Sequence, residues 1–137
     1  MSPGIEVHDH LLTGYKPLVY SRDWMVALLN FEESMQVQKA IEIEQHQHTD
    51  EVFILVKGRA AFYLVVEDQP LEIIEMDPGK IYNVIKGTWH NLLATPGAAF
   101  CIVENRDTDI LDTHIRALTV SERHQMFAQL PAWLKGE

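Results

Sequence analysis

The chain has 137 residues, enough for one ordinary domain with a buried core, and its 47% hydrophobic content argues against wholesale disorder and against a membrane protein. Its 11 basic and 20 acidic residues give a formal net charge of −9, which repels phosphate backbones and anionic lipids, so we expect neither nucleic acid nor a membrane as a partner. No apolar run reaches the roughly 18 residues that span a bilayer, and the first residues lack a signal-peptide pattern. We therefore expect a single cytoplasmic domain over residues 1–137.

Apolar and polar residues alternate along most of the chain, which is the period of β-strands. Two N-terminal segments, 16–21 and 24–31, predict edge strands within residues 15–31. Seven short segments rich in β-branched and aromatic residues follow: 40–48, 51–58, 60–66, 71–76, 80–85, 91–95 and 98–104. Glycine, proline and aspartate separate them, as at 77–79, which is typical of tight turns. The spacing indicates a β-sandwich or barrel over residues 37–104.

The end of the chain changes to a helical pattern. Thr119 and Glu122 have the spacing of a capping box, in which each side chain bonds the other's backbone N–H. Apolar residues then recur at helical spacing: Val120, Phe127, Leu130 and Leu134. Pro131 lacks a backbone donor and clashes with the preceding turn. We therefore predict a helix over about 119–130.

Four side chains in two clusters have the chemistry of metal ligands. His46 and His48 are two residues apart on a predicted strand, so their rings should share one face. Glu51 follows a short turn, and His90 comes 39 residues after it. Trp89 precedes His90 and should point away from it into the packing. Imidazole and carboxylate together suit a divalent transition metal, namely Fe, Mn, Ni, Zn or Cu.

Two further residues are candidates for handling a proton near these ligands, namely Glu44 and Tyr82. Glu44 has the same strand parity as His46, so an unbroken strand would place both on the interior face. Either the strand bulges between Glu44 and His46, which is the interpretation we favour, or Glu44 lines the cavity beside the metal. Parity alone does not place Tyr82.

Two stretches resemble the sequence motifs of the cupin superfamily. HQHTDEVFILVKG at 46–58 is similar to the first motif, which reads histidine, any residue, histidine, a short gap, glutamate, six residues and glycine. GKIYNVIKGTWHN at 79–91 is similar to the second, which places a histidine after a glycine turn. The gap from His48 to Glu51 is two residues where three or four are commoner, and Ile85 stands where the second motif usually has proline.

The resemblance implies an all-β fold, the double-stranded β-helix or jelly-roll-like cupin barrel, followed here by the short C-terminal α-helix. It implies these metal ligands: His46, His48, Glu51 and His90. The amino-acid sequence is similar to that of small single-domain cupins of unassigned function and, more faintly, to that of ureidoglycolate lyase. Cupins commonly pair through edge strands, so the resemblance also implies a homodimer, to which Trp24, Phe127 and Trp133 could contribute an apolar patch.

Three functions are compatible with such a barrel. A metal with open coordination positions could serve a lyase, isomerase or dioxygenase that acts on a small oxygen-rich molecule such as a carboxylate, sugar or ureido compound. The barrel could instead bind or sense such a molecule without turnover. In the third case it holds no metal, and its histidines only form hydrogen bonds.

Overall fold

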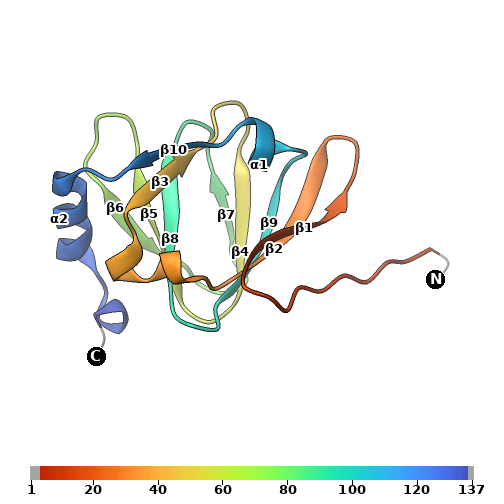
Figure 1. Ribbon diagram of the computed structural model, residues 1–137, viewed down its shortest axis with the longest axis horizontal. Coiled ribbons are helices and arrows are strands. Elements are labelled where there is room, and N and C mark those ends of the chain that lie inside the picture. The colour runs from red at the N-terminus through yellow and green to blue at the C-terminus, as the bar shows by residue number, and fades with distance from the viewer. Residues whose placement is uncertain (1–3, 136–137) are drawn as a thin grey trace.

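The computed structural model describes residues 4–135, and these form two antiparallel five-stranded sheets that face one another (Figure 1). The first sheet has the order β1 (Gly14–Tyr20), β2 (Trp24–Asn30), β9 (Ala99–Asn105), β4 (Glu51–Lys57) and β7 (Ile81–Val84). The second has the order β10 (His114–Ala117), β3 (Glu42–Gln45), β8 (Trp89–Ala94), β5 (Ala60–Val65) and β6 (Glu72–Glu75). Two short helices complete the fold, α1 (Thr108–Leu111) and α2 (Val120–Gln129). The all-β prediction with a C-terminal helix is confirmed.

Residues 4–135 also contain three single-turn 3₁₀ helices: Glu33–Met35 and Val37–Lys39 lie between β2 and β3, and Ala132–Leu134 follows α2. Within residues 4–135, no helix has both the length and the apolar character that a bilayer crossing would require.

The inner faces of the two sheets carry ionisable side chains at one end of the barrel and apolar side chains toward the other. Strands β4 and β9 pair so that three inward-facing rows lie side by side: Glu51 with Glu104, Phe53 with Ile102, and Leu55 with Phe100. Strand β8 follows the same order, from the ionisable His90 to the apolar Leu92 and Ala94. The apolar members of these rows belong to one buried cluster between the sheets, in which Phe53 and Phe62 pack edge to face at 5.2 Å. One end of the barrel is therefore closed by apolar packing, while the other carries buried ionisable groups.

The outer face of the second sheet is buried as well, because α2 covers it (Figure 1). A second apolar cluster fills this layer: Val37, Ala40, Ile43, Tyr63, Val65, Leu71, Leu93, Leu118, Met126 and Leu130. Trp89 packs against this cluster, so its side chain points away from the inward-facing His90, as predicted.

Helix α2 begins at the predicted capping box. Glu122 N–H donates to Thr119 Oγ1 at 3.0 Å, and Thr119 N–H donates to Glu122 Oε1 at 2.9 Å. The predicted apolar face is partly wrong, because Val120 is 73% exposed and Phe127 is 43% exposed. Met126, which the helical pattern did not include, is fully buried.

Two glutamine side chains of α2 bind the backbone at the β6 edge of the second sheet. Leu71 N–H donates to Gln125 Oε1 at 2.9 Å, and Ile73 N–H donates to Gln129 Oε1 at 3.2 Å. Gln129 Nε2 also donates to Leu71 C=O at 2.7 Å. Because an uncovered edge strand offers unpaired backbone groups to other chains, these bonds protect this edge of the sheet.

Backbone conformation and close packing explain why the first cupin-like motif ends in glycine. Gly58 has φ +83°, and a Cβ at this position would lie 2.7 Å from Ala98 Cα. Any other residue would therefore be strained and would also push the turn at Ala98 away.

Candidate metal centre

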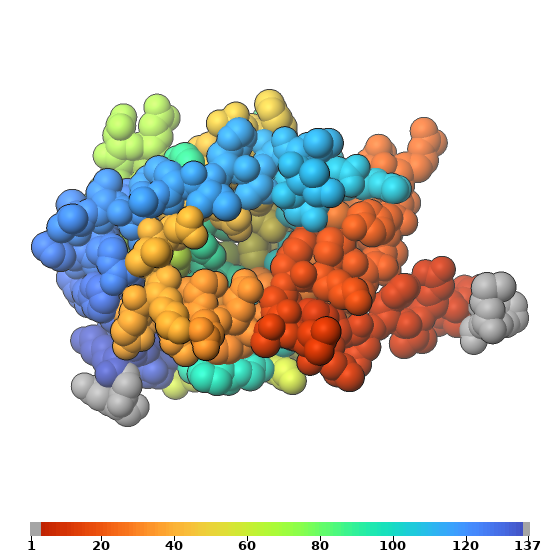
Figure 2. All heavy atoms as spheres, viewed as in Figure 1, coloured from red at the N-terminus to blue at the C-terminus, as the bar shows by residue number. Residues whose placement is uncertain are grey.

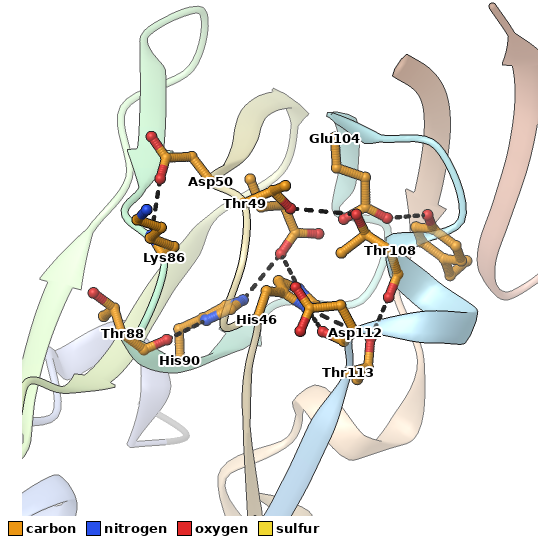
Figure 3. Close-up of polar contacts among 12 residues, drawn as sticks. His46, Thr49, Asp50, Lys86, Thr88, His90, Glu104, Thr108, Asp112 and Thr113 are labelled. Atoms are coloured by element: carbon orange, nitrogen blue, oxygen red, sulfur yellow. Dashed lines mark hydrogen bonds and ion pairs between the residues drawn. The ribbon is translucent and has the colours of Figure 1, made fainter. Parts of the chain in front are cut away.

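Three strands bring His46, Glu51 and His90 together at the polar end of the barrel. His46 follows the end of β3, Glu51 begins β4, and His90 lies on β8. Both Nε2 atoms face one carboxylate oxygen, since Glu51 Oε1 lies 2.8 Å from Nε2 of His46 and 3.0 Å from Nε2 of His90. All three residues are at least 95% buried. In Figure 3 the dashed lines from the two histidines converge on this oxygen.

The far nitrogen of each histidine is fixed by a backbone carbonyl. His46 Nδ1 lies 2.8 Å from Asp112 C=O, and His90 Nδ1 lies 3.0 Å from Thr88 C=O (Figure 3). A carbonyl oxygen only accepts hydrogen bonds, so each Nδ1 must carry a proton and donate it. In a neutral imidazole, Nε2 then has the free lone pair that a metal would use.

If both imidazoles are neutral, their Nε2 lone pairs face the carboxylate of Glu51, and acceptors then face acceptors. A proton or a metal cation between these atoms removes the repulsion. Burial opposes ionisation of Glu51, but the hydrogen bonds from His46 and His90 outweigh it and lower the pKa of Glu51 to about 2. Burial likewise opposes protonation of His46, but the bond to Glu51 and its charge raise the pKa of His46 to about 9. A second proton on each ring, or one divalent cation replacing those protons, would satisfy the cluster, so the donor set fits a metal.

Glu44 lines the same cavity as the histidines, so the bulge favoured from the sequence is wrong. Glu44, His46 and His90 all line the cavity, and Glu44 is the register partner of His90 in the pairing of β3 with β8. One ligand atom from each of Glu44, His46 and His90 can lie within 4.8 Å of the others. Burial raises the pKa of Glu44, which a bound cation would reverse.

Glu104 is a further buried carboxylate at this end, and the sequence analysis did not select it. It lies beside Glu51 in the β4–β9 pairing and is 5% exposed. Tyr15 Oη donates to Glu104 Oε1 at 2.6 Å, while Glu104 Oε2 is buried without a hydrogen-bond partner. Burial and the charge of Glu51 raise the pKa of Glu104 to about 9. Its inward parity with Phe100 and Ile102 was the available signal.

His48 does not join this cluster. The chain leaves the strand after Gln45, so the parity argument that placed His46 and His48 on one face is wrong. The His48 side chain is exposed, and its backbone N–H donates to Asp112 Oδ2 at 2.9 Å. With Glu44 and His46 in the two histidine positions of the motif, the gap to Glu51 becomes four residues, one of the commoner lengths.

Tyr82 also lies away from the cavity. Its ring packs against Phe62 with ring centroids 5.9 Å apart, and its hydroxyl accepts from Asp77 N–H at 2.7 Å. The structure therefore does not bring Tyr82 to the groups on which it was expected to act.

A cavity of about 240 Å³ opens beside these residues. Figure 2 shows it as a hollow between the orange segment that connects β2 and β3 and the blue segment from α1 to β10. Asp109 and Thr113 of the latter segment line the cavity, and Asp112 anchors His46. No strand was predicted for this segment, although β10 forms one edge of the second sheet. Sequence reasoning therefore missed one wall of the site.

No protein-family model matches the chain, and no curated protein matches it. Among solved structures, a cupin-2 domain protein from Shewanella frigidimarina is 25% identical over 70% of this chain and 85% of its own, with a TM-score of 0.50. Bacillus subtilis oxalate decarboxylase, studied for its Mn(II) centres, is 18% identical over 72% of this chain, with a TM-score of 0.53. A Lactobacillus farciminis oxalate decarboxylase in a formate complex is 14% identical over 72%, with a TM-score of 0.52.

This chain covers only 27% of the B. subtilis oxalate decarboxylase chain and 30% of the L. farciminis chain. At such low identity these two likenesses concern the arrangement of strands and not the chemistry of the site.

Proposed function

This chain has the cupin fold, and on that premise we propose that its buried histidines and carboxylates hold one divalent transition metal. The proposed ligands are Glu44, His46, Glu51 and His90: ligand atoms of Glu44 and the two histidines lie within 4.8 Å of one another, and Glu51 contacts both histidines. One observation carries the proposal: two histidines, each with Nδ1 committed to a carbonyl, direct Nε2 at the same carboxylate oxygen. A cation between them removes the conflict between these acceptors.

The candidate metals are Fe, Mn, Ni, Zn and Cu. Two imidazoles with two carboxylates suit all of these ions, and protein sites select among them by geometry and availability. The Mn(II) centres of the B. subtilis oxalate decarboxylase make manganese the first ion to test.

The metal would face the cavity, where we propose that it meets a small oxygen-rich metabolite. When bound, such an ion polarises an oxygen atom of its ligand and orients it. The chain's own residues would hold the ligand in a small space: Leu29, Met35 and Leu92 give the apolar wall, and Glu104 gives a polar one. This arrangement serves a metal-dependent lyase, isomerase or dioxygenase, and equally a binding or sensing module.

Metal analysis of the purified protein tests this proposal. We expect about one equivalent of metal in the wild type, and at least a tenfold weaker affinity in His46→Ala, because even residues that only support a ligand contribute 10–100-fold. His124→Ala, which removes an exposed histidine of α2, is the matched control and should retain the metal. Equal, substoichiometric metal in the wild type and in His46→Ala would contradict the proposal and leave a metal-free barrel.

Turnover separates the enzyme from the binding module. The metal-loaded protein would be incubated with small acids, sugars and ureido compounds, and both binding and product would be followed. Binding without product would favour the module, and product that disappears in His46→Ala would favour the enzyme.

The homodimer stays a prediction. Trp24 is 46% exposed and Phe127 is 43% exposed, so both are free to contribute to an apolar interface. Light scattering at micromolar concentration checks it, and a monomeric mass would contradict it.

A further inference from the structure

The cavity beside the proposed metal ligands is acidic. Five carboxylates lie on its wall: Glu32, Glu44, Glu51, Glu104 and Asp109. Within residues 4–135, the side chains that line it include neither lysine nor arginine. The two histidines of the wall, His46 and His90, bond a carbonyl through Nδ1 and would hold the metal through Nε2, so both rings are neutral once the metal is bound. The side chains described around the metal-loaded cavity therefore include no cation that could pair with an anionic ligand.

A bound metal does not cancel this charge. On the proposed function, the two positive charges of a divalent ion are balanced by Glu44 and Glu51. Three carboxylates then remain, those of Glu32, Glu104 and Asp109. Burial and Glu51 raise the pKa of Glu104 without the ion, and a cation beside it favours its ionised form. Because charge of one sign in a cleft with low-dielectric walls is felt strongly, the metal-loaded cavity repels anions.

Glu104 is the residue of this group that is built to contact a ligand. It is 5% exposed, and its register pairing with Glu51 holds it beside the metal ligands. Tyr15 fixes one carboxylate oxygen through a 2.6 Å hydrogen bond, while the other oxygen is buried without a partner. One oxygen of Glu104 lies within 4.8 Å of ligand atoms of His46 and Glu51, so Glu104 is also an alternative metal ligand. Where Glu44, His46, Glu51 and His90 hold the ion, the partnerless oxygen is instead a place for a hydrogen-bond donor that arrives with the ligand, since buried polar atoms nearly always have a partner.

We infer that the ligand of this cavity is a small neutral or cationic molecule whose hydroxyl or amino group donates to Glu104, and that small carboxylates are rejected. The cavity of about 240 Å³ is below the about 300–1,000 Å³ typical of sites for drug-sized ligands. This inference rests on the proposed metal site and narrows its ligand class. The structural likeness to oxalate decarboxylases therefore does not extend to an anionic ligand.

Three probes with the same three-carbon skeleton test the charge preference: glycerol, glycerate and 2-amino-1,3-propanediol. The protein would be loaded with Zn²⁺, which is diamagnetic, and titrated with each probe by NMR. We expect glycerol and the amine to bind at least about tenfold more tightly than glycerate, since like charges brought together are penalised. In Glu104→Gln the preference for the amine over glycerate should fall about tenfold, with metal content unchanged.

The control is Glu42→Gln, which makes the same charge change at an exposed position of β3 and should keep the wild-type preference. Tightest binding of glycerate, or no binding of glycerol and the amine, would overturn the inference. Loss of metal in Glu104→Gln would also overturn it, because Glu104 would then be a metal ligand. In each case the metal content of the wild type and of His46→Ala still decides the proposed function separately.

Discussion

The two faces of the second sheet are both buried but have different contents. Toward the barrel interior, β8 presents His90 and Leu92 beside the cavity, and toward α2 the same strand presents Trp89 and Leu93. The outer layer is apolar, with its helix capped and bonded to the sheet edge. The inner layer places several ionisable groups out of contact with water.

This difference separates the source of stability from the site of chemistry. Burial of apolar side chains stabilises the fold, whereas burial of carboxylates and imidazoles is costly unless they are paired or bind a metal. The apolar layer beneath α2 therefore holds in place the strands whose other face carries the metal ligands. Substitutions in the outer layer should change stability, and substitutions in the inner layer should change metal binding.

The largest expected effect on stability is at the centre of the outer layer. Met126 is fully buried beneath α2, so Met126→Ala should lower the free energy of unfolding by about 2–5 kcal/mol, the usual cost of this deletion in a core. Denaturant titration measures it. The neighbouring Phe127→Ala should cost about 1 kcal/mol or less, because that residue is 43% exposed and its ring lies against the guanidinium of Arg123 at the surface. If the folded Met126→Ala protein keeps its metal affinity, the outer layer serves stability and not metal binding. A large loss of metal affinity would contradict this separation of the two layers.

A smaller effect is expected at the start of α2, and it depends on pH. The hydrogen bonds from Arg116, at 2.8 and 2.9 Å, lower the pKa of Glu122 to about 2 against the opposing effect of burial. A lowered pKa stabilises the fold fully above the ordinary value of 4.5, and this stabilisation is lost as the pH falls toward 2. Glu122→Gln should therefore cost about 1 kcal/mol at pH 7 and almost nothing near pH 2.

Unfolding curves between pH 2 and 7 for the wild type and Glu122→Gln check this dependence. Glu72→Gln on β6, an exposed glutamate with the same change of charge, is the control and should track the wild type. A difference between wild type and Glu122→Gln that stays constant with pH would argue against the ion pair with Arg116 as its cause.

The strands of the barrel were predictable because their side chains alternate and their turns carry glycine or proline. The same signals were missing between residues 105 and 118, where charged and apolar residues follow no period of two or of 3.6. Strand β10 depends instead on its register with β3, which is a tertiary interaction. The cavity wall formed by Asp109 and Thr113 could therefore not be read from this segment.

The prediction that His46 and His48 share one face was wrong for a different reason. Alternation assigns faces only while the chain stays extended, and β3 ends at Gln45. His46 continues the strand's inward parity and is held by Asp112, whereas His48 turns outward. A motif shifted by two residues puts Glu44 in the first ligand position and lengthens the gap to Glu51 from two residues to four, but the sequence analysis had placed the motif on His46 and His48.

His48→Ala is expected to have the smallest effect of all. The side chain is exposed, and only its backbone N–H bonds Asp112, so unfolding free energy should change by less than about 0.5 kcal/mol. Metal content should also match the wild type, while Glu44→Gln, on the inner face, should bind metal more weakly. If His48→Ala instead loses metal as completely as His46→Ala, residues 46–50 must rearrange around the ion, and the unshifted motif would describe the bound state. The comparison of the two faces would then hold for the protein without metal only.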